Sequence, residues 1–167
     1  MSLLIFVCVG SRPYQFNRLF EELDRLVGAG YVKDSLFAQI GASTYEPKNF
    51  RFEHFMDPDA FKAKIAEADI VISHGASGSI MGALNAGKRV IAVSRLAKYG
   101  EHINDHQVGI NETLAAEGLV LAVREMDELG DAIEAMESGR LHLKPWHNPS
   151  PNAIIDEIDR FIQEEVL

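Results

Sequence analysis

Cysteine, long apolar runs and positive charge are what this sequence has least of. Its one cysteine, Cys8, cannot form a disulfide within the chain, which favours a reducing compartment, the cytoplasm. No run approaches the ~20 apolar residues of a membrane helix, and the short apolar run 3–9 lacks the basic start and cleavage site of a signal peptide. With 16 Lys and Arg against 25 Asp and Glu, the net charge of −9 argues against a domain that coats nucleic acid.

Low-complexity tracts are also absent, so 167 residues with 47% hydrophobic content are expected to fold as one globular unit. Short runs rich in β-branched residues alternate with segments of helical period, a pattern typical of a parallel sheet covered by helices. We therefore predict an α/β fold, a Rossmann-like open, mainly parallel sheet with helices on both faces. The expected strands are residues 3–9, 35–40, 51–55, 69–73, 89–93 and 119–123.

Helices are expected between these strands, because apolar residues there recur at three- and four-residue spacing and are followed by glycines. The first expected helix contains Phe16 and ends at Gly28 and Gly30. The others are one capped by Asp57 that buries Phe61 and Ile65, one with Ile80, Ala83 and Leu84 that ends at Gly87, one from Asn104 or Asp105 to Gly118 that buries Ile110 and Leu114, and one capped by Asp127.

The last part of the chain is predicted to be a connector and a helix. Three prolines in residues 143–151 each remove a backbone donor, so residues 143–150 are predicted to be a stiff connector between the α/β domain, residues 1–142, and the chain end. Ser150 and Pro151 then begin an amphipathic helix over residues 151–167. This helix packs either on the same domain or on a partner.

Residues 73–79, Ser-His-Gly-Ala-Ser-Gly-Ser, lead from a buried strand through a turn of small residues into a helix. Gly75 and Gly78 permit a sharp turn, and the first turn of the helix presents unpaired N–H groups at the positive end of its dipole. Phosphate oxygens suit such a place, and Ser77, Ser79 and His74 can add hydrogen bonds. The same residues also suit a plain tight connection. The segment lacks the lysine of a P-loop and the first-strand position of a dinucleotide fingerprint.

A second polar segment, residues 95–107, follows the next strand and contains amides, carboxylates and imidazoles suited to hexose hydroxyls. Carboxyl ends of parallel strands line one crevice, so this segment and the turn at 73–79 are expected to face each other. Arg95 and Lys98 can neutralise a diphosphate, or they are simply two solvated cations. The turn after the first strand, with Ser11 and Arg12, is a candidate second wall of the crevice.

These segments resemble the C-terminal, donor-binding domain of MurG-like glycosyltransferases. The opening motif of that family matches residues 9–19, its phosphate loop residues 73–80, and its sugar motif, the most specific of the three, residues 98–107. The resemblance spans most of the chain. It is closest to the short, stand-alone catalytic subunit of two-part UDP-sugar transferases, of the bacterial exopolysaccharide or capsule type.

The resemblance implies a nucleotide-sugar-binding GT-B C-terminal half over residues 1–142. It further implies an inverting hexosyltransferase whose donor is a UDP-sugar and whose acceptor is a polyprenyl-diphosphate-linked saccharide in exopolysaccharide or glycolipid synthesis. The acceptor would be held by a membrane-anchored partner subunit, needed for activity, which would recruit this chain to the inner face of the membrane. No cofactor, metal or nucleic acid is expected.

By the same resemblance, His74, Gly75 and Ser79 contact the diphosphate, and His106 and Gln107 contact the transferred sugar. The general base is unassigned and expected on the partner, with His74 a lesser candidate. The full set of predicted substrate-binding residues is Ser11, Arg12, His74, Gly75, Ala76, Ser77, Gly78, Ser79, Arg95, Lys98, Glu101, His102, Asn104, His106 and Gln107.

One position departs from the family pattern. Many relatives carry a glutamate three residues after the phosphate-loop serine, where it binds the ribose hydroxyls, and here that position is Gly82. Residues 57–59 match the Asp-x-Asp metal motif of other glycosyltransferases, but a helix cap explains them. His102 and His106 are four residues apart, yet no third metal ligand accompanies them.

Two other functions stay open at this point. One is a nucleotide hydrolase that cuts an N-glycosidic bond with a glutamate on the helix after the turn, although Gly82 stands where that acid is expected. The other is a non-catalytic nucleotide-sugar-binding partner subunit.

Overall fold

The structure is a computed structural model that describes residues 2–75, 77–147 and 160. Its centre is one six-stranded sheet in the order β3-β2-β1-β4-β5-β6, and every pair of neighbouring strands is parallel. The predicted open, parallel sheet is therefore confirmed. The strands are β1 Leu4–Cys8, β2 Ser35–Gln39, β3 Arg51–Glu53, β4 Ile70–Ser73, β5 Arg89–Val93 and β6 Leu121–Val123.

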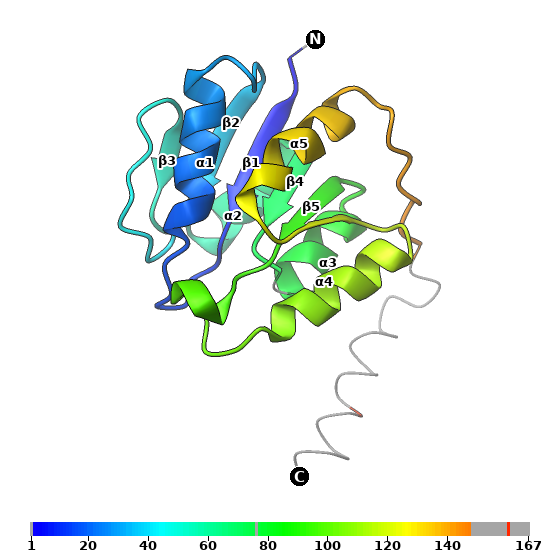
Figure 1. Cartoon of the computed structure of the whole chain (residues 1–167). Helices are drawn as coiled ribbons and strands as arrows, with labels where there is room; N and C mark the ends of the chain where they lie inside the picture. Colours follow the sequence, from blue (N-terminus) through cyan, green and yellow to red (C-terminus); the bar gives the residue numbers. More distant parts are fainter. Residues whose placement is uncertain (1, 76, 148–159, 161–167) are drawn as a thin grey trace.

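Helices cover both faces of the sheet, as predicted (Figure 1). The helix α1 (Asn17–Gly28) packs with α5 (Leu129–Glu137) on one face, and α2 (Pro58–Glu67) packs with α3 (Ser77–Asn85) on the other. The helix α4 (His106–Ala116) joins the second layer next to β6. Short 3-10 turns lie at Ala97–Tyr99 and Met126–Glu128.

The core consists of two apolar layers, one on each side of the sheet. In β1, Ile5 and Val7 belong to the layer under α1 and α5, whereas Phe6 and Cys8 belong to the layer under α2 and α3. All four side chains are fully buried, which is why this strand reads as a continuous apolar run rather than an alternating one.

The capping residue predicted for α2 is confirmed, and the one predicted for the last helix is not. Asp57 caps α2 as predicted, because its carboxylate accepts a hydrogen bond from the Ala60 N–H at 2.8 Å. Asp127 caps no helix: it lies inside a 3-10 turn that is closed by a capping box of Glu125 and Glu128.

The prediction that Ile110 is buried is wrong. Ile110 is 43% exposed, and the buried residues of α4 are Val108 and Asn111. The inward face of this helix is turned so that a polar residue packs against the turn after β4, and a pattern that counts only apolar residues assigns that face incorrectly.

The described part of the connector is bonded to residues at the ends of α4 and α3. The Lys144 N–H donates to the Gly118 carbonyl at 2.8 Å, and the Trp146 indole Nε1 donates to the Asn85 side-chain oxygen at 2.8 Å. Residues 143–147 contain no helix or strand, as expected. The remainder of the predicted connector and the helix 151–167 lie outside the described residues, apart from Arg160. Every helix in the described parts of the chain falls short of the length and apolarity that crossing a membrane requires.

Candidate functional site

A cavity of about 460 Å³ opens at the carboxyl edge of the sheet, beyond the ends of β1, β4 and β5. These three strands are neighbours, so the turns that follow them meet, as the sequence predicted. The cavity is lined by Gly10, Ser11, Arg12, His74, Gly75, Gly78, Ser79, Arg95, His102, His106, Gln107 and Ile110.

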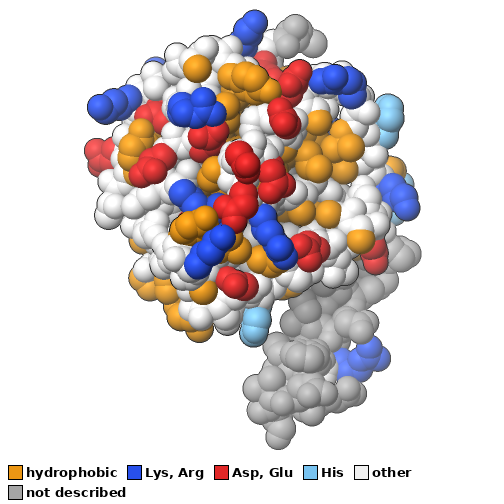
Figure 2. Space-filling view, in the orientation of Figure 1, with side chains coloured by type: hydrophobic (Ala, Val, Ile, Leu, Met, Phe, Trp, Pro, Cys, Tyr) orange, Lys and Arg blue, Asp and Glu red, His pale blue; other side chains and the backbone are white. Residues whose placement is uncertain are grey.

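A larger hollow of about 710 Å³ lies between α1 and α5 but has a different character. Its lining includes Glu22, Asp127 and Asp131 beside Arg25. On this face of the molecule, acidic and basic side chains lie intermixed (Figure 2). Carboxylates repel an anionic ligand, so the cavity at the strand ends is the candidate site for the predicted phosphates.

The turn between β4 and α3 forms one wall. Gly75 has a φ of +83°, and a Cβ atom there would lie 2.5 Å from the Asn111 Nδ2, so both the backbone and the space require glycine. Asn111 is fully buried and donates to the Ser94 hydroxyl at 2.9 Å, so α4 supports the turn from behind. The helix α3 then starts at Ser77, and the first N–H groups of any helix have no partner within it.

His74 is 5% exposed, and its ring presents a hydrogen-bond acceptor to the cavity. Burial, with the Arg95 charge beside it, lowers the pKa of His74 to about 4, so the ring is neutral at pH 7. Its Nδ1 lies 3.3 Å from the Cys8 carbonyl, which assigns the proton to Nδ1 and leaves a lone pair on Nε2. That nitrogen lies by the β1 turn, since a Cβ atom on Gly10 would be 3.1 Å from it.

Arg95 is a fixed positive charge in the cavity wall, although it is only 1% exposed. Its Nη2 donates to the carbonyls of Val9 and Tyr14 at 2.9 and 3.1 Å, whereas its Nε has no hydrogen-bond partner among the described residues. Burial lowers the pKa of Arg95 to about 10, and Glu101 opposes that shift, so the guanidinium stays charged at pH 7. A buried charged donor without a partner is costly, and the guanidinium charge beside the cavity attracts an anionic ligand.

The third wall is the segment from β5 to the first turn of α4, which brings His102, His106 and Gln107 to the cavity. The His102 ring packs at 5.1 Å from the ring of Tyr14. The Gln107 Oε1 accepts a hydrogen bond from the Arg95 N–H at 3.3 Å, so its NH₂ group is the part left to donate to a ligand.

Three of the predicted binding residues do not line the cavity. Lys98 is exposed and forms an ion pair with Glu125 at 2.9 Å, and the Asn104 side chain accepts from the His106 N–H at 3.1 Å. Glu101 is 1% exposed, with both carboxylate oxygens engaged by protein donors. Its predicted contact with substrate is replaced by a structural role, because a carboxylate needs protein partners when it is buried. All of Ala76 and the side chain of Ser77 lie outside the described residues.

Three residues that shape the site were missed by sequence reasoning. Gln39 accepts from the N–H groups of Val9 and Gly10 and donates to the Gly10 carbonyl, which holds the turn after β1. An amide at the end of an otherwise apolar strand was a usable signal. Asn111 and Arg18 gave none, because polar residues in helices are ordinarily exposed. No group of three His, Cys, Asp or Glu side chains within residues 2–75 and 77–147 is arranged to hold a metal ion.

Comparisons with known proteins show the family of the chain and support its fold. The model of the glycosyltransferase family 28 C-terminal domain matches residues 4–157. The chain is 32% identical over 125 residues to the human UDP-N-acetylglucosamine transferase subunit ALG13, in an alignment that covers 68% of this chain and 10% of the human protein. The chain thus spans about a tenth of the length of that relative.

Solved structures share the fold. MurG from Acinetobacter baumannii superposes with a TM-score of 0.59 at 18% identity, over 98% of this chain and 50% of that one. A solution structure of ALG13 superposes with a TM-score of 0.57 at 18% identity, over 99% of this chain and 96% of that one. Identities this low speak for the fold alone, and they agree with the predicted Rossmann-like C-terminal half of a GT-B glycosyltransferase.

Proposed function

The chain belongs to the family of glycosyltransferase family 28 C-terminal domains, and from this premise we propose that it is the donor-binding, catalytic subunit of an inverting glycosyltransferase. It transfers a hexose from a UDP-sugar to a polyprenyl-diphosphate-linked acceptor, in exopolysaccharide or glycolipid synthesis. The observation that supports this most is the meeting of a buried cation, Arg95, with the start of α3 in one cavity.

The donor diphosphate is proposed to lie between Arg95 and the turn before α3. The Nε of Arg95 lacks a partner among the described residues, and Ser79 lines the same cavity. In a chain of net charge −9, such donors concentrate positive potential locally. Because they are held in place before the reaction, they stabilise the negative charge that grows on the leaving UDP without reorganising.

The hexose is proposed to face His106 and Gln107. These residues stand at the start of α4, on the wall opposite the phosphate turn. The amide of Gln107 donates to sugar hydroxyls, and the neutral ring of His74 accepts from one through Nε2. His102 borders the same space.

The ribose must be held differently from that of relatives with a glutamate at position 82. A Cβ atom on Gly82 would have no atom within 4 Å, and a hollow of about 490 Å³ between α2 and α3 begins there. This hollow shares Gly78 and Ser79 with the phosphate cavity. We propose that the nucleoside lies over this opening, whose polar lining side chains are Lys62, Ser79 and Asn85.

The acceptor is assigned to a separate, membrane-anchored subunit. The human relative is by its name a transferase subunit, and this supports the proposal. The general base is expected on the partner, which would also recruit the chain to the inner face of the cytoplasmic membrane. His74, as a buried neutral acceptor, is the candidate base on this chain.

Calorimetric titration with UDP, UMP and AMP tests the diphosphate site. We expect UDP to bind about tenfold or more tightly than UMP, because only UDP reaches both Arg95 and the α3 N-terminus. Equal, weak binding of all three nucleotides would remove the proposed function. Cleavage of a nucleotide would instead indicate the hydrolase.

Reconstitution tests the division of labour. The purified chain with a lipid-linked acceptor is expected to turn over only after the partner subunit is added. Full turnover by the isolated chain would refute the two-part enzyme, and binding without turnover in the reconstituted pair would identify a non-catalytic binding subunit.

A further inference from the structure

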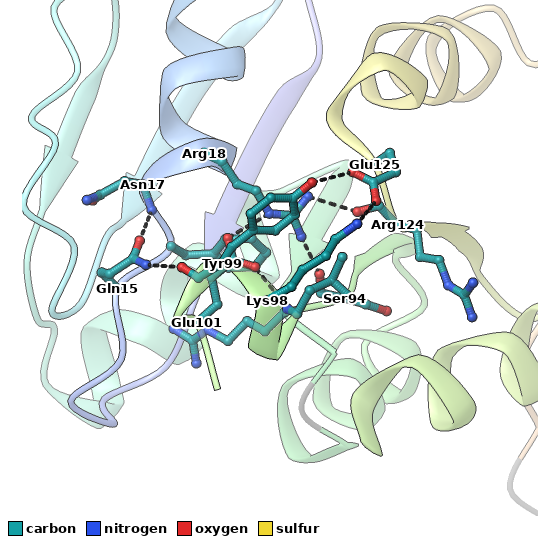
Figure 3. Close-up of polar contacts among 12 residues, drawn as sticks. Gln15, Asn17, Arg18, Ser94, Lys98, Tyr99, Glu101, Arg124 and Glu125 are labelled. Carbon is teal, nitrogen blue, oxygen red and sulfur yellow. Dashed lines mark hydrogen bonds and ion pairs between the residues drawn. The ribbon is translucent and has the colours of Figure 1, made fainter. Parts of the chain in front are cut away.

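The segment that contains His102 and leads to His106 and Gln107 is anchored by an ion pair between a partly buried arginine and a buried glutamate. The β5–α4 segment, residues 94–105, runs from the end of β5 to the residue before α4. Figure 3 shows Arg18 reaching from α1 toward this segment, where it meets Glu101. Their closest approach, Nε to Oε2, is 2.6 Å.

Every nitrogen of the Arg18 guanidinium is used. Nε donates to Glu101, Nη1 donates to the Arg124 carbonyl at 2.8 Å, and Nη2 donates to the Ser94 carbonyl at 2.8 Å. The guanidinium carbon also lies 4.7 Å from the centre of the Tyr99 ring. One side chain of α1 therefore joins the end of β5, the segment after it and the residue after β6.

Glu101 completes the arrangement from the other side. Its side chain is 1% exposed, Oε2 accepts from Arg18, and Oε1 accepts from the Leu96 N–H at 2.9 Å. A buried carboxylate that loses its cationic partner is strongly destabilised, so the two residues enforce each other's position. The Gln15 amide adds a hydrogen bond to the Tyr99 carbonyl at 3.0 Å.

The phosphate side of the cavity has separate supports. Asn111 packs behind Gly75, and His74 is bound to the Cys8 carbonyl, with neither contact involving Arg18. Arg95 is held by the carbonyls of Val9 and Tyr14. Two links join the sides, because Arg18 and Asn111 both bond to Ser94 and the Glu101 charge acts on Arg95. The direct contacts of His74, Gly75 and the Arg95 guanidinium do not include the ion pair, so its loss is expected to act mainly on the hexose side.

We propose that Arg18 and Glu101 are positioning residues for recognition of the donor hexose. They hold the β5–α4 segment in place before the ligand arrives, so that His102, His106 and Gln107 face the hexose without an ordering cost at binding. Neither residue contacts the substrate, since neither lines the cavity. This inference rests on the proposed function and adds to it the residues that determine hexose selectivity from outside the cavity.

The test measures hexose discrimination separately from nucleotide affinity. Dissociation constants are determined for UDP and for UDP-glucose, UDP-galactose, UDP-N-acetylglucosamine and UDP-glucuronate, and discrimination is the ratio between the weakest and the tightest UDP-hexose. Arg18→Lys keeps the charge but cannot make three directed bonds, and Glu101→Gln removes the charge at constant size. Arg25→Lys is the matched control, because Arg25 lies on the same helix and pairs with Glu22 at the surface.

We expect Arg18→Lys and Glu101→Gln to lower discrimination about fivefold or more while UDP affinity stays within about twofold, an effect the size of one or two lost hydrogen bonds. Arg25→Lys is expected to change neither value. Hydrogen exchange of amides 96–105 should accelerate in both Arg18 and Glu101 variants while that of β1 does not, which separates local loosening from unfolding.

Unchanged discrimination in both variants would overturn the inference. So would equal weakening of UDP and all four UDP-hexoses, which indicates a general structural role, and so would a wild-type chain that binds UDP but does not discriminate among hexoses. A wild-type chain that fails to bind UDP would instead remove the proposed function itself.

Discussion

The burial of His74 predicts a defined loss of stability on acidification. The native ring is neutral, with burial and then Arg95 lowering its pKa from the ordinary 6.5 to about 4. In the unfolded chain this histidine binds a proton near pH 6.5, whereas in the folded chain it does so only near pH 4. The free energy of unfolding therefore falls as the pH decreases from about 6.5 to about 4. Integrated between pH 7 and pH 5, this one group costs about 2 kcal/mol of unfolding free energy.

The perturbation that isolates this contribution is His74→Gln, which keeps a polar side chain but cannot titrate. Unfolding free energies of both proteins are measured by urea denaturation at pH 7 and pH 5. The wild type should lose about 2 kcal/mol more than the variant, because all other titrating groups cancel in the comparison. Added UDP should shrink the wild-type loss, since a diphosphate next to the ring favours the protonated form.

The result that refutes this reasoning is an equal pH dependence of the two proteins. It would mean that the ring is already charged in the native state at pH 5. In that case His74 would be a hydrogen-bond donor to phosphate rather than an acceptor in the cavity, and its candidacy as a base would end.

Three further predictions follow from the same geometry. Ser79→Ala should weaken UDP binding by ~1 kcal/mol, the loss of one hydrogen bond. Gln107→Ala should leave UDP binding unchanged and reduce discrimination among UDP-hexoses. Calorimetry with UDP and the UDP-hexoses checks both variants, and reversed effects would show that the two walls are misassigned. Gly75→Ala should cost about 1–3 kcal/mol of unfolding free energy through its left-handed backbone and its contact with Asn111, and denaturation equal to wild type would contradict this. Burial raises the pKa of Glu137 to about 7, so the stability from its protonated form is complete below pH 4.5 and is lost as pH rises to about 7. The Glu137→Gln variant should therefore lose less stability than the wild type when the pH rises from 4.5 to 7. Thermal unfolding of both proteins across this pH range measures the difference.

Local chemistry predicted the frame of the fold and the phosphate turn. Short runs rich in β-branched residues, alternating with segments of helical period, predicted all six strands, and the Asp57 cap predicted the start of α2. These signals act between residues close in sequence. The predictions were wrong where contacts between residues far apart in sequence determine which side chain is buried. Ile110 is exposed because Asn111 occupies the inward face of α4 against Gly75, a packing that apolar periodicity does not contain.

What the sequence by itself determined is the order of strands and turns, and hence that small residues, His74 and the polar segment after β5 share one edge of the sheet. What only the tertiary structure decided is which polar groups face the cavity. Lys98, Glu101 and Arg95 are charged residues of one polar segment, yet their environments differ. Lys98 is exposed, Glu101 is buried in an ion pair with Arg18, and the Nε of Arg95 has no hydrogen-bond partner among the described residues. The physical reason is that the burial of a charge depends on partners supplied by other elements of the fold, and a single sequence does not say which ones will meet.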